Sequence, residues 1–166
     1  MKQIQAIVYT SNTGFTARYA AMLGEKTGLP VYPLTDAKEK LEKGTPILYM
    51  GWLFGSNVKG YSQASKRYKI IAVCGVGLCD TGALLEEVRK TISLPQSIPL
   101  FTLQGGMDRS KLRGFNRWVI NTLTNALSKQ KDLAPEKQRM LELLQTDGDY
   151  VSAENLERVV QWYQQA

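Results

Sequence analysis

The stretch IQAIVYTSNTGFT, residues 4–16, decides the fold expected for this chain. Residues 4–9 are mostly apolar and include β-branched and aromatic side chains, which predicts a buried strand. Residues 10–16 contain four hydroxyl side chains, one amide side chain and one glycine, and a helical pattern begins at Phe15. A strand that ends in a polar, glycine-containing turn before a helix is typical of the first half of a βαβ unit.

The rest of the chain continues this alternation of short strands and helices. Apolar runs predict further strands at residues 31–34, 46–51, 68–74 and 98–103, and periodicity predicts helices at residues 15–26, 36–43 and 81–91. Later helices are expected at residues 110–128, 135–145 and 152–162. Alternating strands and helices with apolar strands predict an α/β fold, in which helices cover both faces of a parallel sheet. Pro33 indicates that the second strand lies near the edge of that sheet.

The length and composition suit a single domain. With 166 residues, 43% hydrophobic and 22% charged, the chain can bury a sizeable core. We expect one domain over residues 1–166, with a core of about residues 2–128 and a C-terminal helical extension of about residues 129–166. The sequence has no apolar run long enough for a membrane span, and residues 1–5 lack the pattern of a signal peptide. Because the chain also has only two cysteines, these features favour a cytoplasmic protein.

The sequence contains no histidine, which excludes several kinds of active site. A Ser-His-Asp triad, a Cys-His pair or an imidazole zinc site cannot be built from this chain. Two cysteines are also too few to hold an iron–sulfur cluster alone. We therefore assign no catalytic side chain and no metal ligand, and we expect any chemistry to come from a bound cofactor.

The polar segment at residues 10–16 has the composition of a phosphate-binding loop. Hydroxyls, the Asn12 amide and the N–H groups of a helix N-terminus favour an anion, and Gly14 allows the backbone to approach it closely. The segment has no lysine or arginine and lacks the GxxxxGK[ST] spacing of nucleoside triphosphate sites. Hydroxyls and amides alone can bind a single phosphomonoester. The alternative is that these residues only form a turn and cap the helix.

Residues 11–16, SNTGFT, fit the pattern T/S-x-T-G-x-T and resemble the FMN phosphate loop of flavodoxins. The resemblance covers about residues 2–128 and implies a flavodoxin-like three-layer sandwich, with a five-stranded parallel sheet in the order 2-1-3-4-5. It also implies non-covalent FMN at the carboxyl ends of the strands, where this loop meets residues 51–60 and 75–82. The cofactor-binding residues implied are Thr10, Ser11, Asn12, Thr13, Gly14, Phe15, Thr16, Gly51, Trp52, Leu53, Phe54, Gly55, Gly75, Val76, Gly77, Leu78, Cys79 and Asp80.

A flavin ring needs an apolar cover and backbone hydrogen bonds at its polar edge. Trp52 is the first candidate for the cover, and Phe54 is either a second cover or part of the core. Leu78 and Cys79 stand where flavodoxins usually place a second aromatic cover, so we expect one face of the ring to be either less protected or open to a stacking substrate. Cys74 ends an apolar strand and is expected to be a buried structural thiol, whereas Cys79 is a candidate for flavin contact or redox sensing.

Positive charge is concentrated in residues 108–139. This segment has eight basic and three acidic side chains, a net charge of +5, whereas the rest of the chain has a net charge of +1. The excess is either a solvated helix face or a docking surface for an acidic redox partner or an anionic membrane surface. We do not expect nucleic acid as a partner.

The segment at residues 103–112, followed by a basic helix, is similar to the flavodoxin-fold protoporphyrinogen IX dehydrogenases. That branch uses FMN and passes electrons towards quinones. Three classes of function therefore stay open. The chain is an FMN-dependent electron carrier that acts with a partner protein, a quinone-linked flavin dehydrogenase, or a non-catalytic module that binds a phosphorylated small molecule.

Overall fold

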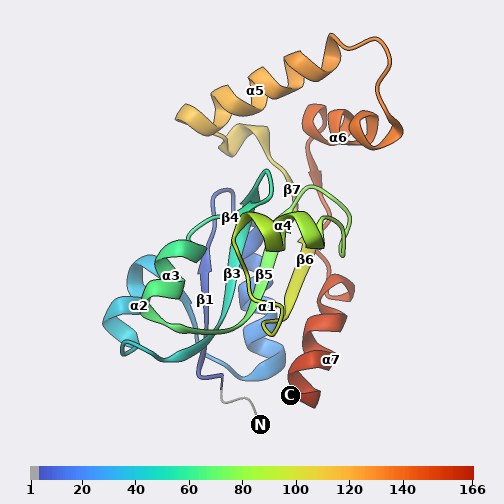
Figure 1. Ribbon diagram of the computed structural model, residues 1–166. Coiled ribbons are helices and arrows are strands. Elements are labelled where there is room, and N and C mark those ends of the chain that lie inside the picture. Colours follow the sequence, from blue (N-terminus) through green and yellow to red (C-terminus); the bar gives the residue numbers. More distant parts are fainter. Residues whose placement is uncertain (1–3) are drawn as a thin grey trace.

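Five parallel strands form the central sheet of the computed structural model, which describes residues 4–166 (Figure 1). They pair in the order β2-β1-β3-β5-β6, which is the predicted order 2-1-3-4-5 because β5 and β6 are the fourth and fifth parallel strands. Their bounds are β1 (Ala6–Thr10), β2 (Val31–Pro33), β3 (Pro46–Phe54), β5 (Lys69–Gly77) and β6 (Leu100–Gln104). The predicted α/β fold with flavodoxin-like topology is confirmed, and β2 lies at the sheet edge, as Pro33 indicates. Residues 1–3, on which the signal-peptide expectation partly rests, lie outside the described residues.

Helices cover both faces of this sheet. Helices α1 (Phe15–Thr27) and α7 (Glu157–Gln165) pack on one face, and α2 (Leu34–Lys40), α3 (Tyr61–Arg67) and α4 (Leu85–Thr91) pack on the other. Because side chains alternate along a strand, Ile7 of β1 joins the core under α1 whereas Val8 joins the core of the opposite face. Tyr19 and Leu23 of α1 are fully buried, as the helical periodicity predicts.

A helical insertion, residues 106–149, separates β6 from the last helix. It contains β7 (Gly106–Met107), the 3-10 helix η1 (Arg109–Lys111), α5 (Gly114–Ser128), α6 (Pro135–Gln145) and β8 (Gly148–Asp149). Strands β7 and β8 pair antiparallel at its base, and α5 packs against α6 around four buried side chains, Met107, Leu112, Leu127 and Leu144. Figure 1 shows α5 and α6 beyond the carboxyl ends of the parallel strands. After the insertion, the 3-10 helix η2 (Glu154–Leu156) leads into α7, which returns beside α1.

The two strands that flank the predicted site are longer than expected. β3 continues to Phe54 and β5 continues to Gly77, so residues 52–54 and 75–77 are strand rather than loop. The extension of β3 is paired on one side with β5 and on the other with the short antiparallel strand β4 (Asn57–Val58). The predicted strand ends at residue 74 and so leaves Gly75 and Gly77 in the following loop. In the structure, a Cβ at either position would lie within 3 Å of the Leu53 side chain. They are strand glycines that allow this close packing.

Several helix boundaries also differ from the prediction. α2 begins at Leu34, with Pro33 as its N-cap, rather than at residue 36, and it ends at Lys40 rather than at residue 43. α4 begins at Leu85 rather than at residue 81, and the expected helix 110–128 is divided into η1 and α5. Helix α3 was not predicted, because its sequence is largely polar and only Ala64 is buried. Within residues 4–166, the structure has no helix with the length and apolar character that crossing a bilayer requires.

Candidate functional site

The carboxyl ends of four parallel strands are aligned in one row across the sheet. The register pairs Thr10 of β1 with Gly51 of β3, Gly51 with Gly75 of β5, and Gly75 with Thr102 of β6. The residues that follow this row therefore emerge next to one another at one edge of the sheet. Ligands of open α/β sheets bind at this edge, where β1 and β3 leave the sheet on opposite sides.

A cavity of about 360 Å³ lies at this edge, within the size range of small-molecule sites. Fourteen of the eighteen predicted residues line it, drawn from all three predicted segments: Ser11, Asn12, Thr13, Phe15, Thr16, Trp52, Leu53, Phe54, Gly55, Val76, Gly77, Leu78, Cys79 and Asp80. The other four do not line it. Thr10, Gly51 and Gly75 lie in the sheet, and Gly14 lines an adjoining polar cleft.

The first turn of α1 and the residues before it supply polar groups to the cavity lining. Gly14 is the N-cap, with φ of +100°, and no side chain caps the helix. The first N–H groups of α1 therefore lack the side-chain acceptor that a Ser, Thr or Asp N-cap provides. Among the described residues, none forms a side-chain hydrogen bond with Asn12, Thr13 or Thr16. Unpaired donors at a helix N-terminus favour an anion.

Two of the four predicted hydroxyls have structural partners. The Gly14 N–H donates to Ser11 Oγ at 3.2 Å and closes the turn, so the turn interpretation holds for Ser11. Thr10 Oγ1 lies 2.7 Å from the hydroxyl of Tyr49, which donates to the Lys59 carbonyl at 2.7 Å. Thr10 therefore connects β1 to the β3–β4 hairpin. The polar side chains of the loop that have no hydrogen-bond partner among the described residues are those of Asn12, Thr13 and Thr16.

An aromatic pair from β3 contributes to the cavity lining. Trp52 and Phe54 are two residues apart on one strand, so they share a face, and their rings meet edge to face with centroids 5.8 Å apart. The Lys59 ammonium lies 5.8 Å from the Trp52 centroid and 5.0 Å from the Phe54 centroid. Sequence reasoning missed Lys59, which places a cation against the predicted ring cover through the pairing of β3 with β4.

The loop after β5 is fixed to the end of β6 by hydrogen bonds. Thr102 Oγ1 donates to the Ala83 carbonyl at 2.7 Å, and the Gly82 N–H donates to the Thr102 carbonyl at 3.0 Å. Gln104 Nε2 donates to the Leu78 carbonyl at 3.0 Å. Leu84, which lines the cavity, has φ of +62°, a conformation that is rare for leucine. The wall formed by residues 78–84 is thus held in one conformation by its contacts with β6.

The two cysteines occupy different environments. Cys74 is fully buried in β5, and burial raises the pKa of its thiol, as expected for a structural cysteine. Cys79 is half-buried in the cavity wall, where burial first and then the charges of Asp80 and Glu87 raise its thiol pKa. A raised pKa disfavours the reactive thiolate, so Cys79 presents a neutral, apolar surface to the cavity.

The helical insertion forms a roof over the cavity that sequence reasoning did not identify. Residues from α5, α6 and the segments beside them complete the lining, among them Leu112, Asn116, Val119, Ile120, Leu123 and Met140. In the sequence, the apolar positions of residues 110–128 matched a helix packed on a core. The signal that could have identified the roof was the wide apolar surface of this helix. The four-residue cluster of the insertion is too small to bury all of that apolar area, so part of it is left to line the cavity.

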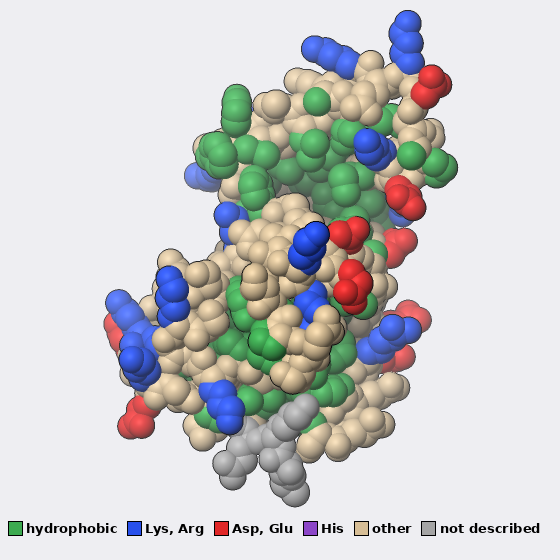
Figure 2. Space-filling view, in the orientation of Figure 1, with side chains coloured by type: hydrophobic (Ala, Val, Ile, Leu, Met, Phe, Trp, Pro, Cys, Tyr) green, Lys and Arg blue, Asp and Glu red, His purple; other side chains and the backbone are tan. Residues whose placement is uncertain are grey.

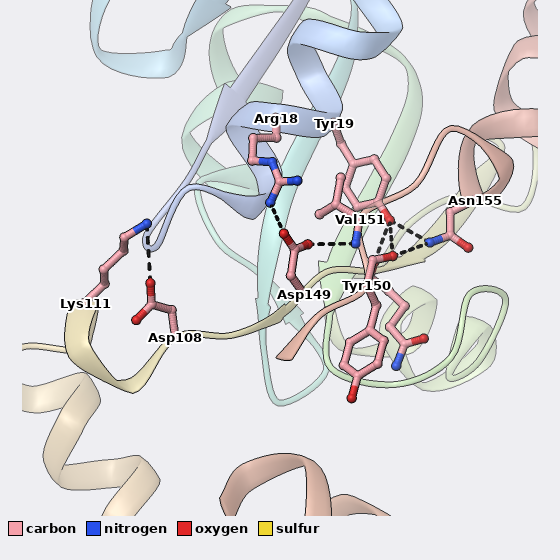
Figure 3. Close-up of polar contacts among 9 residues, drawn as sticks. Arg18, Tyr19, Asp108, Lys111, Asp149, Tyr150, Val151 and Asn155 are labelled. Atoms are coloured by element: carbon pink, nitrogen blue, oxygen red, sulfur yellow. Dashed lines mark hydrogen bonds and ion pairs between the residues drawn. The ribbon is translucent and has the colours of Figure 1, made fainter. Parts of the chain in front are cut away.

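The adjoining polar cleft brings two cations close to the turn at residues 13–14. Thr13 and Gly14 line it together with Arg18, from the first turns of α1, and Lys111, from the insertion. Both cations are paired with carboxylates: Arg18 Nη1 lies 2.7 Å from Asp149 Oδ2, and Lys111 Nζ lies 3.4 Å from Asp108 Oδ2 (Figure 3). Because Asp147 also lines this cleft, its three carboxylates outnumber the two cations, and the cleft adds no net positive charge beside the loop.

Figure 3 also shows how the base of the insertion is attached to α1. The Tyr19 hydroxyl donates to the Gln104 carbonyl at 2.5 Å and accepts from Asn155 Nδ2 at 2.7 Å. Asp149 Oδ1 accepts from the Val151 N–H at 3.0 Å. The Tyr19 contacts hold the end of β6 and the start of η2, on either side of the insertion, against α1.

Within residues 4–166, no group of three or more Cys, Asp or Glu side chains has an arrangement that could hold a metal ion. No protein-family model matches this sequence, and no curated protein matches it.

Proposed function

We propose that this protein binds FMN without a covalent bond and acts in electron transfer. The observation that carries the proposal is the composition of one cavity. Its lining combines free hydroxyl, amide and helix N–H groups from residues 12–16 with aromatic and aliphatic side chains from β3, the loop after β5 and the insertion. FMN combines the same two kinds of group, because it joins a phosphomonoester to a flat, mostly apolar ring. The flavodoxin-like loop at residues 11–16 supplies the polar groups of the cavity lining.

The residues present fit the two parts of this cofactor. Asn12, Thr13 and Thr16 are available to hold the phosphate, together with the first N–H groups of α1. Trp52 and Leu78 supply apolar surface for the ring, and the insertion excludes water from above. When bound, FMN supplies one- and two-electron redox chemistry, for which the protein provides position and electrostatic surroundings.

The first test is the ligand itself and the loop that binds it. We expect purified protein to be yellow, and mass spectrometry of the ligand released by gentle denaturation to identify FMN. In titrations of the apoprotein followed by flavin fluorescence, Thr13→Ala and Thr16→Ala should each weaken binding by about 1–3 kcal/mol, roughly 5- to 150-fold. Thr35→Ala is the matched control, because this exposed threonine lies on α2 and bonds only to Asp36.

Two results would count against the proposal in different ways. Unchanged FMN affinity in both variants would place the phosphate elsewhere. A protein that binds a phosphomonoester but no flavin would be the non-catalytic module instead of a redox protein.

The roof of the cavity favours a second function, a quinone-linked flavin dehydrogenase of the protoporphyrinogen-oxidising type. A carrier that acts only with a partner protein needs an exposed ring edge, whereas this cavity continues under Val119, Ile120 and Leu123. These side chains add an apolar compartment that suits a flat, apolar substrate. Turnover of a porphyrinogen with a quinone, in the absence of an acceptor protein, would establish this function.

Leu123→Ser separates the dehydrogenase from the carrier. Leu123 is 40% exposed, so the substitution should leave the fold intact. For a dehydrogenase we expect a several-fold higher KM for the apolar substrate and unchanged FMN affinity, since none of the residues assigned to the phosphate or the ring belongs to α5. A protein that exchanges electrons with a partner protein but not with a quinone is the carrier.

A further inference from the structure

Helix α5 exposes two large aromatic side chains that do not line the cavity. Phe115 is 68% exposed and Trp118 is 62% exposed, and their ring centroids lie 5.8 Å apart with a 30° angle between the planes. Neither residue lines the cavity, whereas Val119 and Leu123 of the same helix do. Figure 2 shows hydrophobic side chains exposed over α5. Together, the two rings form an apolar surface at the end of the molecule away from α7.

Two basic side chains without acidic partners, Arg113 and Arg117, lie within two residues of this pair in the sequence. Residues 109–131 contain six basic residues and no acidic residue. Arg109 bonds within the insertion and Lys111 pairs with Asp108. In the described part of the chain, no carboxylate lies within ion-pair distance of Arg113 or Arg117, and both side chains are exposed. The aromatic pair therefore lies in a segment that carries two exposed, unpaired arginines and no acidic residue.

We infer that this patch, Arg113, Phe115, Arg117 and Trp118, docks the protein on an anionic lipid bilayer. Exposed aromatic rings lie favourably at the boundary between headgroups and acyl chains, and tryptophan is enriched there. Arginine side chains beside them are attracted to anionic headgroups. An isologous contact with a second copy would bring two basic segments together, which opposes self-association.

The geometry also favours a bilayer over an acidic protein. The two rings are apolar, adjacent and exposed on a helix whose Val119 and Leu123 line an apolar cavity. A helix that lies on a membrane with its Phe115 and Trp118 side inserted leaves the cavity close to the lipid phase. An apolar molecule dissolved in the bilayer would then have a short path to the site. The docking itself depends only on the patch and does not require the cofactor.

The test is co-sedimentation of the full chain with vesicles at low ionic strength. We expect binding to vesicles of phosphatidylglycerol and phosphatidylcholine, weak binding to phosphatidylcholine alone, and release by high salt, because the attraction is screened. Trp118 fluorescence should shift to shorter wavelength on binding, and this shift should be absent in Trp118→Phe.

Substitutions separate the two contributions. Phe115→Gln with Trp118→Gln should reduce the partition coefficient at least tenfold at any salt concentration, because apolar burial is lost. Arg113→Gln with Arg117→Gln should reduce it about 25-fold at low salt, at about fivefold per charge, and little at high salt. The matched control is Lys38→Gln with Lys40→Gln, which removes two exposed charges from α2 and should leave binding unchanged. All four substituted patch residues are exposed, so unchanged circular dichroism is expected.

Three outcomes would overturn the inference. Equal vesicle binding by the patch variants and the control would show that the charge of the whole protein is responsible. No vesicle binding, with retention on immobilised polyglutamate that the patch variants lose, would indicate an acidic protein partner. Concentration-dependent dimerisation that Phe115→Gln with Trp118→Gln abolishes, again without vesicle binding, would assign the patch to a second copy of this chain.

Discussion

The parallel sheet and the helical insertion both contribute walls to the same cavity, but they are held together differently. The two faces of the sheet are packed by clusters of thirteen and twelve buried residues, whereas the insertion is centred on four. Its helix α5 buries only Thr124 and Leu127 and exposes Phe115 and Trp118. A small cluster gives a lower free energy of local unfolding than a large one. The floor of the site is thus expected to be rigid and its roof able to open.

The largest expected effect compares one leucine from each region. Leu48 is 1% exposed in β3, and Leu48→Ala should lower the free energy of unfolding by about 3 kcal/mol, through lost burial and the cavity left behind. Leu127→Ala in the insertion should lower it by about 1 kcal/mol or less, because α5 and α6 can open while the sheet stays folded. Urea denaturation measures both values.

Hydrogen exchange provides the control for this comparison. Leu127→Ala should accelerate amide exchange in α5 and α6 and leave β1, β3 and β5 unchanged. If Leu127→Ala instead accelerates exchange in the sheet as much as in the insertion, the two regions unfold as one unit and the comparison is wrong.

Alkaline pH should destabilise the sheet region and spare the insertion. Burial raises the pKa of Tyr49 to about 12, while the hydrogen bond with Thr10 lowers it by a smaller amount. Below the ordinary pKa of about 10 both states carry the proton and stability is complete. Between pH 10 and 12 the unfolded state ionises first, so the free energy of unfolding should fall by about 1–2 kcal/mol as pH rises.

Tyr49→Phe identifies the source of that fall. The variant should be about 1–2 kcal/mol less stable at neutral pH, since the Lys59 carbonyl and Thr10 lose a partner, and its stability should depend less on pH above 10. The insertion contains no tyrosine, so exchange in α5 should not follow this titration. An unchanged alkaline slope in the variant would exclude Tyr49 as the group responsible.

The smallest expected effect is at the junction of the two regions. The hydrogen bond from Arg18 is the main cause that lowers the pKa of Asp149, and both side chains are about half exposed. The stabilisation is present above the ordinary carboxyl pKa and is lost as pH falls through the lowered folded value. We expect Asp149→Asn to cost about 0.5 kcal/mol, observed as faster exchange at the base of the insertion at neutral pH but not in strong acid.

Glu142→Gln is the matched control for the junction. It removes the 3.7 Å pair with Arg139, which lies within α6 and joins no two elements. Equal effects of Asp149→Asn and Glu142→Gln would mean that the Arg18–Asp149 pair does not attach the insertion to α1.

Most of the sheet and the polar loop could be predicted because their signals are local. The apolar strands, the helix that ends at Gly28 and the hydroxyl-rich turn at residues 10–16 are each encoded in a few neighbouring residues. Gly28 adopts the left-handed conformation expected of a C-terminal cap. The topology then brought fourteen of the predicted residues to one cavity.

The rest depends on contacts between residues distant in sequence. From the sequence, Gly75 and Gly77 resemble loop residues. Their role in the strand is apparent only from the structure, in which the Leu53 side chain packs on both of them. β7 and β8 have two residues each and are separated by two helices, so no periodicity reveals their pairing. Lys59 approaches Trp52 only because β4 folds back along β3. These features are specified by tertiary packing, which local patterns do not contain.

The pairing of β7 with β8 has a consequence for the modular construction of the molecule. Gly106 lies opposite Asp149 and Met107 lies opposite Gly148, so the chain leaves the sheet domain and returns to it at adjacent points. A two-residue Asn-Gly hairpin turn could therefore join Met107 directly to Gly148 and excise both helices. Such a minimal protein would keep the register between β6 and α7. The forty intervening positions are therefore a segment that could be exchanged for another while the sheet and its flanking helices stay unchanged.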